Sequence, residues 1–259
     1  MTRYQRSPRG PRILRVDGAA QTTVDSAARA AGVLNFSANR EIYGHSSVKR
    51  ALSRMQSNRC AYCETYVKPA QPGHVDHFRP CGAVKQNDGA PRLVPGYFWL
   101  AYRWDNLVLA CLRCNTSHKR DLFPLRQPHQ RARVPGQEDE TAGPLFIHPI
   151  TDEPRDHLRY REAAAYPVNG SDKGLIMRDM FRLNRDRMLL GHRREYLETF
   201  KNSARVAESH PAPQTRRRAE TLVGRLLAGE GQYLAMIRDA FRAMVASGEI
   251  MRLAVLCPP

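Results

Sequence analysis

Apolar residues recur at helical spacing in three parts of the chain. In residues 46–56 (SSVKRALSRMQ), Val48, Leu52 and Met55 fall on one face, which predicts a short helix. Ser46 or Ser47 can cap its start. Towards the C-terminus, two longer apolar stripes predict amphipathic helices over residues 218–228 and 233–246, the first ending near Gly229. The stripes consist of Ala219, Leu222, Val223, Leu226 and Leu227, and of Tyr233, Met236, Ile237, Ala240, Phe241, Met244 and Val245.

The remaining patterns divide the chain into four segments. Residues 1–45 have many arginines and no clear apolar face, and we expect an irregular basic N-terminal arm. Residues 46–125 contain two short apolar runs, around VDHF and WDNLVLAC, which predict strands, followed by a helix over NTSHKRDLF. Residues 126–165 are polar and rich in proline and glycine, typical of a loop-rich connector. Residues 166–259 are predicted to be mainly helical.

The chain is strongly basic, with 41 lysine and arginine residues against 25 acidic residues and a formal net charge of +16. Such an excess favours a polyanionic partner, nucleic acid before a membrane surface, although a merely basic protein stays an alternative. No apolar run is long enough to cross a bilayer. Since we find no secretory signal pattern either, we expect a cytoplasmic protein without a membrane partner.

Four of the six cysteines form two C-x-x-C pairs, Cys60 with Cys63 and Cys111 with Cys114. Two such pairs can offer four thiolates to one tetrahedral Zn²⁺, so we predict a structural zinc site. Buried thiols or a redox-active pair are the alternatives. Cys81 and Cys257 lie outside the pairs, and the sequence assigns them no role.

Between and after these pairs lie Asp76-His77-Phe-Arg-Pro80, Asn106-Leu107 and Cys111-Leu-Arg-Cys114-Asn115. Here the sequence resembles the HNH (ββα-metal) endonuclease family. The resemblance implies an α+β fold in which a ββα-metal nuclease core is stapled by the four-cysteine zinc site and flanked by mainly helical segments. It also implies hydrolysis of phosphodiester bonds with a catalytic divalent cation.

The resemblance assigns the catalytic roles. His77 is implied as the general base, and an imidazole suits this task because its ordinary pKa lies near neutrality. Asp76 and Asn115 are implied as ligands of Mg²⁺ or another divalent cation, which prefers hard oxygen donors. Asn106 is implied to hold the intervening loop and orient His77.

Four further residues near the motif are candidates for binding the substrate phosphates: Arg79, Arg113, His118 and Lys119. His118 comes three residues after Asn115, so it could instead be an extra metal ligand. Lys119 follows Asn115 by four positions, where many HNH proteins have their basic residue at three.

The resemblance extends over roughly residues 46–200 to the HNH nucleases of bacterial anti-phage systems, of the Septu and retron-associated types, through CAYCE, HKRDLFPL, PLFIHPITDEPRDHLRY and LNRDRMLLGHRREYL. It implies an ATPase subunit as partner. We expect a DNA substrate, with RNA cleavage or a non-catalytic, zinc-stapled nucleic-acid-binding protein as alternatives. Because the C-terminal stripes lie outside the motif, truncation after about residue 210 is expected to leave the zinc site formed but to break association with this partner.

Overall fold

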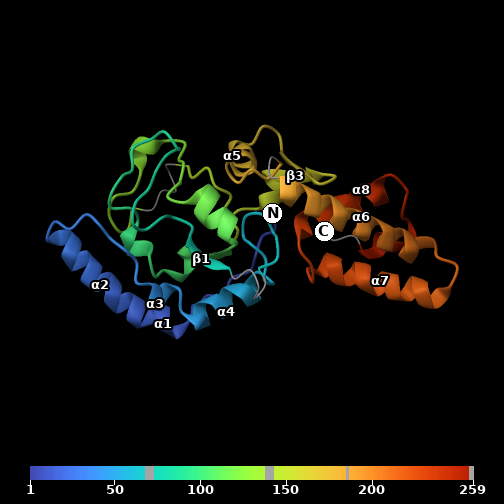
Figure 1. The fold of residues 1–259 in the computed structure, drawn as a ribbon, viewed down its shortest axis with the longest axis horizontal. Helices are drawn as coiled ribbons and strands as arrows, with labels where there is room; N and C mark the ends of the chain where they lie inside the picture. The colour runs from blue at the N-terminus through green and yellow to red at the C-terminus, as the bar shows by residue number, and fades with distance from the viewer. Residues whose placement is uncertain (68–72, 138–142, 185–186, 257–259) are drawn as a thin grey trace. The chain divides into compact units, whose positions relative to one another are not determined.

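The protein is described by a computed structural model, which covers residues 1–67, 73–137, 143–184 and 187–256 (Figure 1). The chain divides into two compact units. One comprises Tyr4–Tyr62 and Val67–Asp152, and the other comprises Met1–Arg3, Cys63–Tyr66 and the chain from Glu153 onward. Residues 4–45 therefore belong to the same unit as most of the segment 46–125 and do not form a separate arm.

The first unit contains a two-stranded antiparallel sheet, in which β1 (His74–His77) pairs with β2 (Leu107–Ala110). The register places His77 opposite Leu107 and His74 opposite Ala110. The helices and short turns of this unit are α1 (Arg12–Arg15), α2 (Asp17–Ala30), α3 (Arg40–Tyr43), α4 (Ser46–Met55), η1 (Phe98–Leu100), η2 (Trp104–Asn106), η3 (Arg113–Lys119) and η4 (Pro128–Gln130). Small sheets among helices confirm the predicted α+β class.

The prediction of an irregular N-terminal segment is wrong, because α2 is a helix of 14 residues. Its sequence is rich in alanine, which has the highest intrinsic helix propensity. The signal was missed because α2 buries little apolar surface of its own. Leu14 in α1 and Ile42 in α3 are nevertheless buried in one core with Val48 and Leu52 of α4.

Helix α4 confirms the helix predicted for residues 46–56, but its cap differs. His45, not Ser46 or Ser47, is the capping residue, and its Nδ1 accepts a hydrogen bond from the backbone N–H of Ser47 at 3.2 Å. An imidazole nitrogen is thus the capping acceptor, where a serine hydroxyl was expected.

The helix predicted over residues 115–123 is shorter and begins earlier. It is a π-helical turn, η3, in which the N–H of Arg120 bonds to the carbonyl of Asn115 at 2.9 Å. Arg120 has a φ of 49°, in the left-handed region, and this ends the turn. Asn115 therefore lies inside the first turn rather than at the helix start.

The second unit joins a β-hairpin to a helical bundle. Strands β3 (Leu158–Arg161) and β4 (Ala164–Pro167) are antiparallel, and they lie at the end of the predicted loop-rich connector and the start of the segment predicted to be helical. The other elements are η5 (Pro154–Asp156), α5 (Asp172–Met180), α6 (Arg187–Ser209), α7 (Pro213–Ala228), α8 (Leu234–Ala246) and η6 (Arg252–Leu256). Helices α6 and α7 run side by side (Figure 1).

Helices α7 and α8 confirm the two predicted amphipathic helices. Gly229 ends α7 with a φ of 101°, a left-handed conformation that glycine adopts without strain. Val223 and Leu227 of α7 are buried, as are Met236, Ile237 and Phe241 of α8. The stripe of α8 is thus largely covered within this chain, whereas Leu222 of the α7 stripe is exposed.

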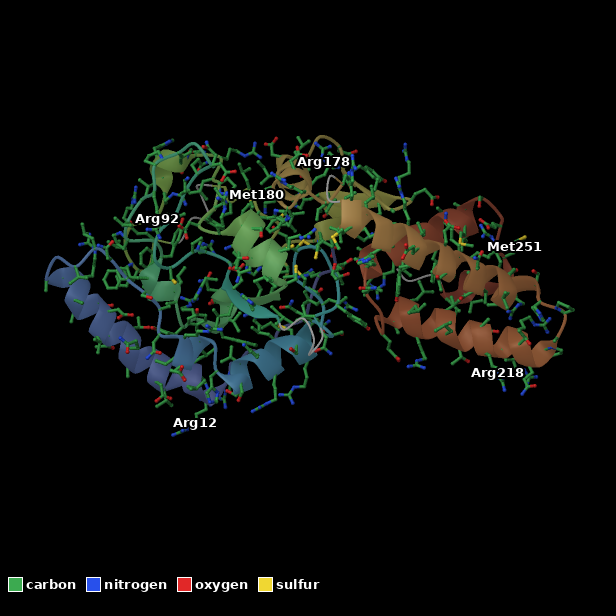
Figure 2. The ribbon with its side chains drawn as sticks, in the orientation of Figure 1. Arg12, Arg92, Arg178, Met180, Arg218 and Met251 are labelled. Atoms are coloured by element: carbon green, nitrogen blue, oxygen red, sulfur yellow. The ribbon has the colours of Figure 1, made fainter. Side chains whose placement is uncertain are left out.

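Figure 2 shows side chains such as Arg12 and Arg218 extending outward from the helices, in keeping with the basic composition. Within the part of the chain that the structure describes, no helix is long and apolar enough to cross a membrane. Cys257 lies outside the described residues.

Candidate zinc centre and active site

The four cysteines of the two C-x-x-C pairs come together. The sulfur atoms of Cys60, Cys63, Cys111 and Cys114 all lie within 4.8 Å of one another. In a tetrahedral zinc site with Zn–S bonds of about 2.3 Å, the sulfurs are about 3.8 Å apart. The four thiols can therefore bind one metal ion such as zinc with a small contraction.

The first C-x-x-C pair is attached to β2 by a buried glutamine. The Gln56 side chain donates to the carbonyls of Arg59 and Leu109 at 2.8 and 2.9 Å, and accepts from the N–H of Leu109 at 2.8 Å. The N–H of Ala61 also donates to the Leu109 carbonyl. Since Cys111 directly follows β2, these bonds bring the two pairs to the same place.

The second pair has the local geometry of a metal-binding turn. The N–H of Cys114 points at the sulfur of Cys111, at 3.4 Å. Backbone N–H groups that donate to a ligand sulfur stabilise the thiolate form, which is the form that binds metal.

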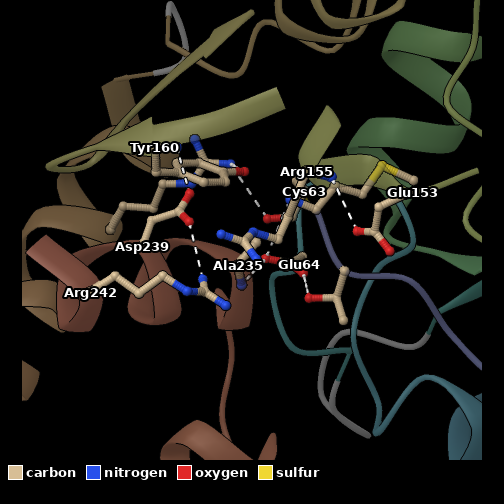
Figure 3. Close-up of polar contacts among 11 residues, drawn as sticks. Cys63, Glu64, Glu153, Arg155, Tyr160, Ala235, Asp239 and Arg242 are labelled. Carbon is tan, nitrogen blue, oxygen red and sulfur yellow. Dashed lines mark hydrogen bonds and ion pairs between the residues drawn. The ribbon is translucent and has the colours of Figure 1, made fainter. Parts of the chain in front are cut away.

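A buried glutamate follows Cys63 directly and contacts α8 (Figure 3). The carboxylate of Glu64 accepts a hydrogen bond from the N–H of Ala235 at 3.0 Å, and its carbonyl accepts from the N–H of Tyr233 at 3.1 Å. Helix α8 has no cap from its own sequence, because Tyr233 occupies the cap position without a capping side chain. Glu64 supplies this cap from 171 residues away.

A fully buried arginine lies at the same loop. Arg193 of α6 donates to the carbonyl of Leu183 at 2.8 Å and to that of Cys63 at 3.5 Å. Its guanidinium lies 5.1 Å from the ring centre of Tyr160 and 5.6 Å from that of Tyr233. Two aromatic faces and two carbonyls thus compensate for a buried charge. Sequence reasoning found neither Glu64 nor Arg193.

Asp76, the first predicted catalytic-metal ligand, lies buried in β1 between two donors. Its Oδ2 accepts from the hydroxyl of Tyr62 at 2.5 Å, and its Oδ1 lies 3.4 Å from the Nζ of Lys119. Lys119 is itself fully buried and donates to the carbonyl of His77 at 2.7 Å. Burial and the neighbouring Asp76 carboxylate raise the pKa of Tyr62 well above its usual range, so this hydroxyl remains a donor.

His77, the predicted general base, ends β1 and is held by a backbone carbonyl. Its Nε2 lies 2.9 Å from the carbonyl oxygen of Ala101. Because a carbonyl can only accept, Nε2 carries the proton and the lone pair of the neutral ring is on Nδ1. The ring also packs against Tyr43, with centres 4.6 Å apart. Burial alone lowers the pKa of His77, but Cys81, Asp76 and the carbonyl of Ala101 together raise it above its ordinary value.

Asn106 joins the end of β1 to the turn before β2. Its Oδ1 accepts from the N–H of Arg79 at 2.8 Å, and its Nδ2 donates to the carbonyls of Arg79 and Leu100 at 3.0 and 3.1 Å. The N–H of Phe78 donates to the Asn106 carbonyl. The buried side chain therefore holds the backbone on the C-terminal side of His77.

The other predicted residues lie on or near the same elements. Asn115 and His118 are half-buried on η3, the turn that also carries Lys119, and Arg113 is exposed on it. Arg79 lies half-buried with its guanidinium 5.4 Å from the ring centre of Phe123.

The comparisons with known proteins are consistent with one relationship. The chain is similar to two proteins named Septu protein PtuB. The one from Bacillus mycoides (strain KBAB4) is 36% identical over 135 residues, covering 52% of this chain and 45% of the relative. The one from Bacillus thuringiensis is 28% identical over 176 residues, covering 65% and 54%. The chain thus spans about half the length of the curated relatives it matches. No family model matches the sequence. No solved structure matches it either.

Proposed function

We propose that the protein is a metal-dependent HNH endonuclease that hydrolyses phosphodiester bonds, with DNA as the expected substrate. One observation carries the proposal. Strand β1 ends in Asp76 and His77, pairs with β2, and is followed along the chain by η3 with Asn115, next to the four-cysteine cluster. The order of strand, strand and helical turn is the one that a ββα-metal core requires, and it supports the proposal.

The arrangement supports general-base chemistry at His77. With Nε2 held by Ala101, Nδ1 is the atom that would take a proton from the attacking water, which has to replace the hydrogen bond between the imidazole and the side chain of Cys81. Asn106 keeps the adjoining backbone in place, so the imidazole does not have to be ordered at each turnover.

Asp76 and Asn115 fit a divalent cation by the chemistry of their donors, a carboxylate and an amide oxygen. Each oxygen of Asp76 has one partner, Tyr62 or Lys119, and a carboxylate offers about four acceptor positions, so lone pairs are left for a metal. A bound cation would stabilise the negative charge that develops on the phosphate.

Lys119 has a different place in this proposal from the one its sequence position suggested. Its ammonium group is buried against Asp76 and the carbonyl of His77, so we assign it to positioning these two groups and not to gripping the substrate. The phosphate contacts then fall to Arg79, Arg113 and His118.

The relatives named Septu protein PtuB support a biological setting. We place the chain as a component of a bacterial anti-phage defence system that works with an ATPase subunit. Co-purification of the tagged protein with an ATPase encoded beside it would support this assignment, and purification of the protein alone under the same mild conditions would oppose it.

A second candidate is a zinc-stapled protein that binds nucleic acid without cutting it. The observation in its favour is the ammonium group of Lys119 beside Asp76, because a buried cation already compensates for that carboxylate. Incubating the purified protein with plasmid DNA and with total RNA, in Mg²⁺ or in EDTA, separates the candidates. Magnesium-dependent cleavage supports the endonuclease, and binding without cleavage in either condition supports the alternative.

A further inference from the structure

Two adjoining cavities lie in the first unit, outside the candidate active site. Their volumes are about 640 and 800 Å³, and both are lined by Ser7 and Trp104. Six arginines line them against two carboxylates, Asp17 and Asp105. The arginines are Arg6, Arg15 and Arg103 in the first cavity and Arg9, Arg12 and Arg54 in the second. The paired cavities therefore combine an indole with a surplus of positive charge.

The backbone at two glycines lies close to aromatic side chains that line the cavities. A Cβ added to Gly10 would lie 2.7 Å from the Cβ and Cγ of Trp104, and one added to Gly18 would lie 2.7 Å from the Cβ of Tyr102. The indole Nε1 of Trp104 donates to the carbonyl of Ser7 at 3.1 Å. The N-terminal segment is thus fitted against Trp104, which fixes the indole between the two cavities.

Arg6 has hydrogen-bonding capacity that the described part of the chain does not use. Its Nη2 donates to the carbonyl of Leu107 at 2.8 Å, and its guanidinium lies 4.8 Å from the ring centre of Trp104. Its Nε and Nη1 are buried without a hydrogen-bond partner among the described residues, and the same is true of the Nε1 of Trp99. Burial lowers the pKa of Arg6 to about 10, although Asp105 opposes the shift. Unused donors on a desolvated cation suit an oxyanion such as a phosphate.

We propose that the paired cavities bind single-stranded nucleic acid, with unpaired bases against Trp104 and phosphates on the surrounding arginines. Unpaired bases expose the faces that an aromatic side chain contacts, whereas a duplex keeps them stacked inside. The positive charge follows the backbone of the strand. This inference rests on the proposed function, because it names the form of substrate that the same nuclease would take.

The cavities are attached to the strands of the candidate active site. Arg6 bonds to the carbonyl of Leu107, and Leu107 is the register partner of His77. Arg6, which lines the first cavity, is therefore bonded to the residue opposite the proposed general base in the β1–β2 sheet. An unpaired segment next to a cleavage site would be selected over a continuous duplex.

Binding is tested without cleavage, in EDTA and in a His77→Ala background, with a labelled single-stranded oligonucleotide as DNA and as RNA, its duplex, and a free mononucleotide. Trp99 and Trp104 are the two tryptophans of the chain. In a Trp99→Phe protein, therefore, fluorescence reports on Trp104 alone. We expect the single strands to quench this fluorescence and to bind at least about tenfold more tightly than the duplex. Equal binding of duplex and single strand, or binding of the mononucleotide alone, would overturn the inference.

Charge reversal locates the surface. Arg12 and Arg15 are exposed on α1, and Arg218 is exposed on α7 as a matched control. The double variant Arg12→Glu/Arg15→Glu should weaken single-strand binding about tenfold or more, with zinc content and melting unchanged, whereas Arg218→Glu should have a much smaller effect. Equal losses in both variants would mean unspecific attraction and overturn the inference. If the protein binds oligonucleotides at this surface but never cleaves nucleic acid, only the nuclease proposal is contradicted. If the double variant cleaves nucleic acid as the wild type does, only the present inference is contradicted.

Discussion

The Nζ of Lys119 lies 3.4 Å from the Oδ1 of Asp76, and both side chains are buried. The pair joins η3 to β1 across 43 residues of sequence. Because the same ammonium group also bonds to the carbonyl of His77, one side chain fixes both residues at the end of β1. The arrangement makes Lys119 a structural support of the proposed active site.

We expect Lys119→Met to destabilise the fold by about 3–5 kcal/mol, because it leaves the Asp76 carboxylate buried without its cation. Urea unfolding measures this. The double variant Asp76→Asn/Lys119→Met should recover much of the loss, since neither charge remains. Lys49→Met, on the half-exposed face of α4, is the control and should cost less than about 0.5 kcal/mol. Equal effects at Lys49 and Lys119 would contradict the buried pairing.

Metal analysis should find about one zinc per chain, from one tetrahedral site of four thiolates. Cys60→Ser and Cys114→Ser should lose the metal and the cooperative melting of the protein, because structural zinc contributes directly to folding. Cys81→Ser is the matched control, since Cys81 lies outside the cluster, and it should keep the zinc. Fully folded protein without metal would show that the cluster is only a group of buried thiols.

Glu64→Ala should destabilise the protein by about 1–2 kcal/mol or more, because it removes the cap of α8 and leaves the N–H of Ala235 buried. Glu41→Ala, exposed at the start of α3, serves as a control and should change the melting temperature little. An unchanged melting temperature in Glu64→Ala would show that α8 does not depend on this carboxylate.

The same contacts revise the expectation for the C-terminal truncation. The Cys63–Tyr66 loop belongs to the unit that contains α6 and α8, and Glu64 and the carbonyl of Cys63 bond directly to these helices. Removing the chain after about residue 210 deletes α8 and should therefore also weaken zinc binding. Full zinc occupancy in the truncated protein would restore the original expectation.

Stability should fall as the pH drops from about 6.5 towards 4, because of His148. Burial, with help from Arg6 and Arg79, lowers the pKa of His148 to about 4, against the opposing effect of Asp152. Its Nδ1 accepts from the N–H groups of Ile150 and Thr151, which requires the neutral ring.

Between these two pH values the unfolded chain binds a proton that the folded chain does not. The free energy of unfolding therefore decreases as the pH falls, by at most about 3 kcal/mol near pH 4. Urea unfolding at several pH values measures the effect. His148→Gln should flatten the profile in this range, while His129→Gln, at an exposed position, should leave it unchanged. Identical profiles for the wild type and His148→Gln would contradict the assignment.

Sequence spacing was sufficient for the features that depend on local order. The C-x-x-C pairs predicted the cysteine cluster because each pair needs only one turn, and the apolar stripes predicted α4, α7 and α8 because helical periodicity is local. The β3–β4 hairpin was missed because Pro154 and its polar neighbours gave a stronger turn signal than the short strands.

The hydrogen bonds that position the candidate site could not be predicted from the sequence, because they join residues far apart along the chain. Gln56 reaches Leu109 across 53 residues, and Arg193 reaches Cys63 across 130. Each is a polar side chain that sequence patterns place at the surface, and each is buried among partners that bond to it. Lys119 is a further case, in which a residue expected to face phosphate faces a carboxylate.

The central claim is that His77 is the base of a metal-dependent nuclease, and the most direct measurement is the cleavage rate of His77→Ala with nucleic acid and Mg²⁺. His74→Ala, at the other end of β1, is the matched control. The account predicts that the wild type and His74→Ala cleave in Mg²⁺ but not in EDTA. It predicts that His77→Ala keeps its zinc and its melting temperature but loses at least about 100-fold in rate. Cleavage by His77→Ala at the wild-type rate would contradict it.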